Sequence, residues 1–172
     1  MLKTVLKKQQ SNILFSVVLL GICMLSSCDS NSVFDDYKTV SSAWNKNDVV
    51  NFNIKVPDST SAYNLFVNVR YTEAYKYNNL FLIVEMDFPH GKIIKDTLEY
   101  KMADPNGKLL GTGLGSVKEN KLWYKEGVVF NESGEYTVKI QHAMRKNGVV
   151  KGIEDLEGIT DIGFRVEALN NK

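Results

Sequence analysis

Few residues of this chain are of the types that carry acid–base or nucleophilic chemistry, and their spacing does not complete a catalytic set. Glu85 and Asp87 lie two apart in a strand-like segment, so their carboxylates point to the same side and could serve glycoside hydrolysis. A solvated sheet face explains this pair equally well. His90 and His142 have no second histidine or cysteine at metal-ligand spacing. We therefore expect a protein that is not an enzyme and that binds neither a metal nor another cofactor.

Two other stretches resemble ligand-binding motifs, but each lacks residues that its motif requires. Residues 111–116, GTGLGS, lack the Gly-Lys-Ser/Thr ending of a phosphate-binding loop and open no helix. The acidic residues between Glu154 and Asp161 lack the residue order of a calcium-binding loop. We expect a flexible loop at the first stretch, and at the second the residue order does not support cation binding. The placement of His142 on a predicted strand favours the core or its rim.

The two cysteines, Cys23 and Cys28, lie in a targeting segment and not in a redox site. Their C-x4-C spacing differs from the C-x-x-C of a thioredoxin-like site, and no further cysteine is present. Three lysines occur within the first eight residues, and the apolar residues 13–25 follow. This order is typical of a secretory signal peptide. As a helix, thirteen residues rise about 20 Å, less than the ~30 Å of a bilayer core.

The end of this segment predicts a lipid anchor. Residues 25–28, Leu-Ser-Ser-Cys, resemble the bacterial lipobox, in which the cysteine thiol receives diacylglycerol and the new amino group receives an acyl chain such as palmitate. Residues 1–27 are then the signal peptide, Cys23 is discarded with it, and the mature chain has no disulfide. Each buried methylene contributes about 0.8 kcal/mol, so two or three acyl chains hold the protein to a membrane that it does not span.

Composition limits the partners of the mature chain. Removal of residues 1–27 leaves 145 of the 172 residues, and the loss of three lysines changes the formal net charge from +1 to −2. A nearly neutral surface argues against nucleic acid or anionic lipid as the main partner, because both require a basic face. The length suits one domain. The oligomeric state stays open at this stage.

Alternation of apolar and polar residues dominates the chain from Trp44 onward. The strand-like segments are residues 49–56, 63–71, 95–103, 122–130, 135–144 and 161–169, together with 79–88, a more continuous apolar run as expected of a central strand. Turn-forming residues separate them, which predicts an all-β fold, an antiparallel β-sandwich of the immunoglobulin or jelly-roll kind, in residues 44–169. The best helical candidates are single turns at 73–77 and 153–157. Residues 28–43 are predicted to be a lipidated tether of up to about 50 Å that can end in an edge strand.

Aromatic residues near strand ends supply the hypothesis for a contact surface. Tyr75, Tyr77, Trp123 and Tyr124 are the residues that we expect to contact a partner, because exposed aromatic side chains anchor protein interfaces or stack on sugar rings. For Trp44 and Trp123, a place in the core or over a sheet edge is the interpretation that we favour.

The order of these features resembles the gliding-motility lipoprotein GldH family over nearly the whole mature length. The resemblance is carried by Cys28-Asp29, residues 33–35 before Tyr37, Trp44, residues 64–82, Asp96-Thr97, DPNGKLLGTGLG at 104–115, and residues 134–136, 140–145 and 153–167. It implies a lipoprotein of the gliding apparatus, associated with type IX secretion, although relatives also occur in bacteria that do not glide. The family supplies no catalytic residues, and its acylated cysteine corresponds to Cys28.

The expectation is therefore a lipid-anchored envelope protein that works by binding other envelope or gliding-machinery proteins and not nucleic acid. The resemblance favours the outer membrane, although Asp29 after the cysteine is an inner-membrane retention cue in some bacteria. A carbohydrate-binding lipoprotein is the alternative, and a hydrolase that uses Glu85 and Asp87 is a distant third.

Overall fold

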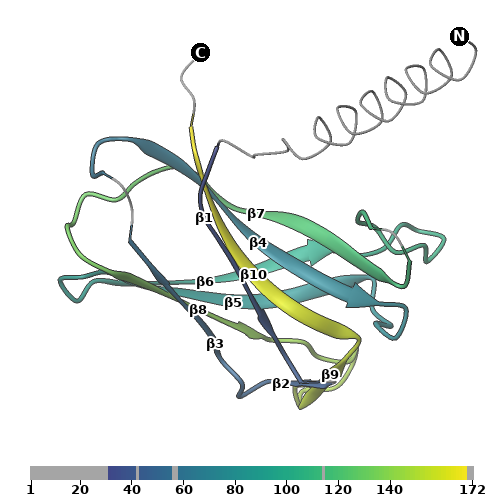
Figure 1. Ribbon diagram of the computed structural model, residues 1–172. Helices are drawn as coiled ribbons and strands as arrows, with labels where there is room; N and C mark the ends of the chain where they lie inside the picture. The colour runs from purple at the N-terminus through teal and green to yellow at the C-terminus, as the bar shows by residue number, and fades with distance from the viewer. Residues whose placement is uncertain (1–30, 42, 56–57, 114, 170–172) are drawn as a thin grey trace, which may run out of the picture. The chain divides into compact units, whose positions relative to one another are not determined.

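Ten strands and no helix make up the part of the chain that the structure describes, residues 31–169 without 42, 56–57 and 114, in a computed structural model. The predicted all-β class is therefore confirmed. The strands form two antiparallel four-stranded sheets that face one another, with a short two-stranded pair at one end (Figure 1). Within these described ranges, no helix is long and apolar enough to cross a bilayer.

The first sheet has the strand order β1-β10-β4-β7. Its members are β1 (Ser32–Thr39), β10 (Ile159–Ala168), β4 (Ala62–Thr72) and β7 (Val117–Val129). Ser32 lies opposite Glu167, and Thr39 lies opposite Asp161, so the start of β1 and the end of β10 are at the same end of the sandwich. The other end of this sheet carries the loop that follows β4.

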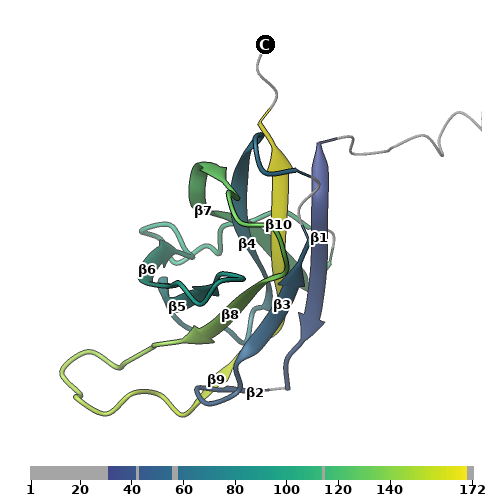
Figure 2. The same cartoon turned by 90° about the vertical axis from the view of Figure 1, so that its left-hand side faces the viewer.

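The second sheet has the strand order β3-β8-β5-β6. Its members are β3 (Val50–Ile54), β8 (Tyr136–His142), β5 (Asn79–Asp87) and β6 (Ile93–Lys101). The remaining strands, β2 (Ala43–Asn45) and β9 (Asp155–Glu157), pair with each other beside it. Figure 2 shows the two sheets edge-on, with the long connection between β8 and β9 extending beyond them.

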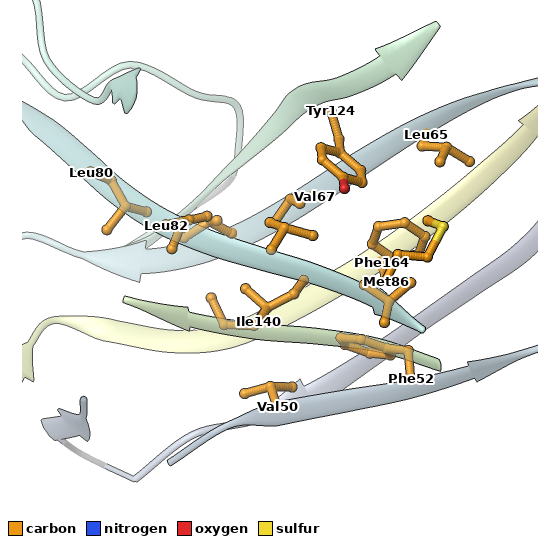
Figure 3. Packing of buried hydrophobic residues seen from close by; sticks show 14 of the residues in the cluster. Val50, Phe52, Leu65, Val67, Leu80, Leu82, Met86, Tyr124, Ile140 and Phe164 are labelled. Atoms are coloured by element: carbon orange, nitrogen blue, oxygen red, sulfur yellow. The ribbon is translucent and has the colours of Figure 1, made fainter. Parts of the chain in front are cut away.

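The core lies between the sheets and follows the alternation in the sequence. Leu65, Val67 and Phe164 point inward from the first sheet, and Leu82 and Ile140 meet them from the second (Figure 3). All five side chains are fully buried. Full burial of such a side chain stabilises a fold by about 1.5–3 kcal/mol, so this layer is what holds the two sheets together.

Trp44 belongs to the core, as we favoured from the sequence. Its ring is fully buried and packs edge-on against His142, with 5.2 Å between the ring centroids. Its indole Nε1 donates a hydrogen bond to the carbonyl oxygen of Asp48 at 2.8 Å. Trp44 thus closes the end of the sandwich beside the β2–β9 pair.

The structure differs from the predictions in one domain boundary and in one type of secondary structure. Residues 32–39, which we assigned to the tether, form β1 and pair with β10 along their length, so the sandwich begins before Trp44. The edge strand that we expected at the end of the tether is β1, and it occupies residues 32–39 of the predicted tether 28–43. Residues 153–157 form no helical turn but contribute β9, because pairing with β2 around the buried Trp44 outweighs their local preference.

Candidate binding surface

The two adjacent aromatic residues of β7 point to opposite faces of the first sheet. Tyr124 points inward and is buried, and its hydroxyl donates a hydrogen bond to Asp96 Oδ2 at 2.8 Å. Trp123 points outward and is 55% exposed. Neighbouring side chains on a regular strand alternate in this way, and Trp123 and Tyr124 keep the alternation although the pairing with β4 shifts register beside them. Tyr124 is thus a core residue, and Trp123 is left as the contact candidate on this strand.

The other two predicted contacts lie in the loop between β4 and β5. Tyr75 is buried, and its hydroxyl donates to the carbonyl oxygen of Asn79 at 2.6 Å. Tyr77 is half-buried and packs edge-on against Tyr75, with 5.7 Å between the ring centroids. This loop lies at the end of the sandwich opposite Ser32, so Tyr77 and Trp123 do not form one patch. Cys28 lies outside the described residues.

Tyr77 contributes to a hollow at that end of the molecule, which we call the end groove. It has a volume of about 580 Å³ and is lined by residues 73, 75–78, 103, 107–109 and 118. Three of these are lysines, and two of the three already have partners. Lys76 lies 3.5 Å from Glu157, and Lys118 Nζ donates to the carbonyl oxygen of Gly113 at 3.0 Å. The end groove is therefore a recess lined by aromatic and charged side chains.

Trp123 rests on a second aromatic ring. Phe66 of β4 lies opposite it, with 4.5 Å between the ring centroids. Lys121 Nζ lies 4.0 Å from the centroid of the Phe66 ring, within the range of a cation–π contact. Although Phe66 points away from the core, it is 3% exposed. Trp123 and Lys121 thus cover an aromatic floor on the outer face of the first sheet, and we call these three residues the Trp123 platform.

A hydrogen-bonded cluster adjoins the platform. Asn68 Nδ2 donates to the Tyr37 hydroxyl at 2.8 Å, and that hydroxyl donates to Glu119 Oε1 at 2.8 Å. Arg70 Nε donates to Glu119 Oε2 at 2.7 Å, and its guanidinium lies 3.9 Å from the centre of the Tyr37 ring. Burial and the bond to Glu119 raise the pKa of Tyr37 above its ordinary value. Tyr37 therefore stays protonated and links β1 to β4 and β7.

Gly163 makes this cluster possible. It lies on β10 between Tyr37 and Asn68 in the strand register. A Cβ atom there would come within 2.7 Å of the Tyr37 ring and 3.1 Å of Asn68 Cβ. The missing side chain lets the tyrosine ring cross β10. Glycine inside an apolar strand often marks a close approach of this kind, and in the segment DIGFRVE it was the available signal for a cluster that our sequence reasoning missed.

Glu85 and Asp87 share the outer face of the second sheet, as predicted, and ion pairs occupy them. Lys139 Nζ lies 3.2 Å from Glu85 Oε1 and 2.5 Å from Asp87 Oδ2, and Lys95 Nζ lies 3.0 Å from Glu85 Oε2. Hydrogen bonds from Lys95 and Lys139 lower the pKa of Glu85. A general acid needs a raised pKa instead. This geometry therefore favours the solvated sheet face over a hydrolase.

His142 lies opposite Leu82, three positions from Glu85 in the strand register, and His90 lies in the turn that follows β5. His142 is buried, and its Nε2 lies 2.9 Å from the carbonyl oxygen of Trp44. Burial lowers the pKa of His142, which keeps the ring neutral. His90 Nδ1 lies 3.2 Å from Glu132 at the surface. Among residues 31–169, apart from the gaps named above, no group of three acidic, histidine or cysteine side chains has the arrangement of a metal site.

The acidic residues near the C-terminus are also paired. Glu154 Oε1 lies 3.0 Å from Lys151 Nζ and 3.8 Å from Lys46 Nζ. Asp155 Oδ1 accepts a hydrogen bond from Asn45 Nδ2 at 2.8 Å. These contacts fix the end of the sandwich around the β2–β9 pair. The described region is thus a β-sandwich protein whose surface offers aromatic and charged contacts.

Comparison with known proteins gives the family of this β-sandwich. The family model described as GldH lipoprotein matches residues 32–166, and the chain belongs to that family, as the resemblance in its sequence suggested. The Christiangramia forsetii protein called gliding motility lipoprotein GldH homolog is 55% identical over 155 residues, which cover 90% of this chain and 95% of that protein. The gliding motility lipoprotein GldH of Flavobacterium johnsoniae is 53% identical over 151 residues, covering 88% and 94%.

Among solved structures, the infectious bursal disease virus Gx strain structure aligns with 84% of this chain and 35% of its own chain. The sequence identity is 13% and the TM-score is 0.35. A score of this size supports no functional argument. The family membership rests on the sequence relatives, whose names support a lipid-anchored protein of the cell envelope linked to gliding motility.

Proposed function

We propose that this lipoprotein is a non-catalytic binding component of the gliding and type IX secretion apparatus. Lipid on Cys28 anchors it in the outer membrane, and the Trp123 platform contacts an envelope protein of the same apparatus. Tyr77, in the end groove, is a second predicted contact. The names of the relatives support the link to gliding motility, and the partner role is our own addition.

The observation that carries this proposal is an exposed tryptophan on a rigid support. The Trp123 ring packs against Phe66, which is itself buried, at a tilt of 52°, and the Trp123 carbonyl oxygen accepts a hydrogen bond from the Tyr100 hydroxyl at 2.7 Å. Interface hot spots are enriched in tryptophan and arginine that are held in place before binding, because little side-chain freedom is then lost. The charged neighbours Lys121 and Glu119 provide the polar rim.

The absence of a catalytic role is supported by the state of the titratable groups. Glu85 is held ionised by two lysines, and His142 is buried and bonded to the Trp44 carbonyl oxygen. Neither group is free to exchange a proton with a bound substrate. The Trp123 platform also lies on a different sheet from Glu85, so these features do not form one site.

The test is cross-linking in cells followed by identification of the captured proteins. Trp123→Ala removes the platform, and Val129→Ala is the matched control, because Val129 is an exposed apolar residue on the same strand. We expect Trp123→Ala to lower recovery of an envelope partner about tenfold or more, as loss of a hot-spot residue does, and Val129→Ala to leave it unchanged. Equal recovery from both variants would contradict the proposal.

A carbohydrate ligand is the second candidate, because an exposed indole between charged side chains can stack on a sugar ring. A glycan array with the unmodified protein separates the two candidates. Binding to a defined glycan that Trp123→Ala abolishes would favour the sugar. Partner capture without glycan binding would favour the envelope protein.

The anchor needs its own test. Fractionation of membranes, with proteolysis of intact cells, locates the protein, and Cys28→Ala is the control. We expect the unmodified protein in the outer membrane fraction and the variant to be lost from that fraction. Recovery in the inner membrane would contradict the outer-membrane assignment and leave the lipid anchor intact.

A further inference from the structure

Strand β6 is an open edge of the second sheet. In the part of the chain that the structure describes, the strand bonded to it is β5. The facing edge of the first sheet, β7, is partly occupied. Glu119 exchanges two backbone hydrogen bonds with Thr112, at 2.8 and 2.9 Å. The Trp123 carbonyl oxygen accepts a hydrogen bond from the Tyr100 hydroxyl. The outer edge of β6, nine residues long, therefore remains available for strand pairing.

The register shows which residues of β6 present their backbone groups to that edge. Phe88 N donates to the carbonyl oxygen of Lys92 at 2.8 Å, and Met102 N donates to that of Asn78 at 2.7 Å. Residues bonded to a neighbouring strand alternate with residues bonded away from it. Even-numbered residues of β6 thus bond to β5. The groups that point outward are those of Ile93, Lys95, Thr97, Glu99 and Lys101.

We propose that a second copy of this chain pairs with β6 antiparallel, about a two-fold axis through Thr97. Lys95 then lies opposite Glu99 of the second copy, and Glu99 lies opposite Lys95, so two opposite-charge pairs form. Thr97 lies opposite Thr97, and Ile93 lies opposite Lys101. Cross-strand pairs of opposite charge and of threonine stabilise a sheet. An interface of this symmetry buries the same patch on both copies.

Exposure along the strand agrees with this pairing. Residues of β6 alternate between exposed and half-buried, without one buried residue, and Ile93 is 60% exposed. On the inward side, the half-buried Ile94 would lie opposite the half-buried Tyr100 of the second copy. Each side chain would complete the burial of the other. Asp96 would lie opposite Leu98, and Lys125 Nζ, at 2.8 Å, already neutralises its carboxylate.

The charges of β6 select this register. An axis at residue 98 instead of 97 would place Lys95 opposite Lys101, and an axis at Lys95 or Glu99 would place like charges together. Lys95 and Glu99 also have capacity for a second partner, although Lys95 bonds Glu85 at 3.0 Å and Glu99 accepts from Asn79 at 2.7 Å. An ammonium group has three donors, and a carboxylate accepts several bonds.

The other long edge with free backbone groups, β1, lacks this self-complementarity. Val40 N donates to the carbonyl oxygen of Thr160 at 2.9 Å, so Asp35, Tyr37 and Thr39 present their backbone outward. An axis at Tyr37 would place Asp35 opposite Thr39, and an axis at Asp35 would bring two carboxylates together. Strand β3 has five residues. Among these edges, β6 is the one whose side chains match a second copy.

The symmetry also predicts how the dimer is oriented on the membrane. This orientation rests on the proposed Cys28 anchor, but the strand pairing does not depend on that anchor. The axis stands perpendicular to the second sheet, so the Ser32 ends of the two copies lie at opposite ends of the joined sheet. Both anchors reach one membrane when the strands lie along its surface and not upright.

Cysteine cross-linking of the full chain in its own membranes tests the pairing. Facing Cα atoms of a hydrogen-bonded pair are about 5.5 Å apart, within the ~4.4–6.8 Å range of a disulfide. Thr97→Cys should therefore give a covalent dimer on mild oxidation. The control, Lys101→Cys, is also exposed on the same edge, but eight residues along the strands separate it from its counterpart, about 27 Å. It should stay monomeric, as should the unmodified chain.

Charge reversal in the Thr97→Cys background sharpens the test. Lys95→Glu and Glu99→Lys each create like-charge pairs and should slow cross-linking about tenfold. The double variant restores opposite charges with the sign exchanged and should regain most of the original rate. Lys101→Glu changes the charge equally but faces Ile93, so it should change little.

Three results would overturn the proposal. They are an absence of dimer with Thr97→Cys, equal cross-linking of Thr97→Cys and Lys101→Cys, and failure of the double charge variant to recover. None of these results depends on the Trp123 platform, so they leave the proposed function unaffected.

Discussion

The outer faces of the two sheets are built from similar residue types, and water reaches them to different extents. On the first sheet, Phe66 and Asn68 point away from the core and are 3% and 2% exposed. On the second sheet, Lys95 and Glu99 point outward from the edge strand β6 and are exposed, and Glu85 of the central strand β5 lies between two lysines. The alternation of a strand assigns a side chain to a face, but neighbouring strands decide whether that face is covered.

The difference comes from the cluster over Gly163. The Tyr37 ring crosses β10 at that residue and covers Asn68, while Trp123 and Lys121 cover Phe66. The second sheet has no such crossing in its described residues, and its outer face is held by lysine–carboxylate pairs. Buried polar contacts cost more to break than solvated ion pairs. We therefore expect the first face to be sensitive to substitution and the second to be tolerant.

The largest effect is expected from Gly163→Val. The new side chain would overlap the Tyr37 ring and Asn68 Cβ, which separates β1 from the cluster, and overpacking of this kind costs about 1–3 kcal/mol. Urea unfolding should show a loss of about 2 kcal/mol in the free energy of unfolding. Gln141→Val on the outer face of β8 is the matched control, with a change within about 0.5 kcal/mol. Similar losses from both variants would remove the contrast between the faces.

A smaller loss is expected from Tyr37→Phe. The ring stays, but Asn68 Nδ2 and Glu119 Oε1 lose their bonds to the hydroxyl. A buried donor left without a partner costs about 1–3 kcal/mol, so we expect a decrease near the lower end of that range in the same assay. Tyr77→Phe serves for comparison, because no bond of its hydroxyl is recorded within the described residues, and it should be nearly neutral. If Tyr37→Phe left the free energy of unfolding unchanged, coverage by the Tyr37 ring, and not hydrogen bonding by its hydroxyl, would account for the stability of this face.

The smallest effect is expected from Glu85→Gln on the second sheet. Hydrogen bonds from Lys95 and Lys139 lower the pKa of Glu85 in the folded protein. Its stabilisation is therefore present above the ordinary glutamate pKa of about 4.3 and is lost as the pH falls through the lowered value. We expect a difference below about 1 kcal/mol at pH 7, reduced by salt, that vanishes in strong acid. A difference that persists at low pH would exclude charge as its cause.

Strand alternation was the part of the fold that the sequence predicted well. It gave the inward residues Leu65 and Val67 and put Glu85 and Asp87 on one face, because period two is a local property of a strand. It also separates Trp123 from Tyr124, although we grouped both as contacts. Adjacent aromatic residues in a strand point to opposite sides, and that inference was available from their positions alone.

What the sequence did not predict depends on contacts between distant segments. Residues 32–39 are rich in polar side chains, and they form a strand because β10 supplies the hydrogen bonds and Gly163 supplies the space for Tyr37. Tyr75 is buried because its loop folds back toward Asn79. Neither contact leaves a periodic pattern, so alternation could not reveal the polar cluster or the end groove.

With the lipid on Cys28 that we propose, the start of β1 at Ser32 also limits how far this domain can travel from the membrane. Three residues separate Ser32 from Cys28, so at about 3.5 Å per residue the connection can reach at most about 14 Å, against the ~50 Å of a tether that ran to residue 43. A lipoprotein domain on so short a linker cannot reach across an aqueous compartment. The partners that we propose would then be those already within one domain's thickness of the bilayer, and the search for them would be two-dimensional.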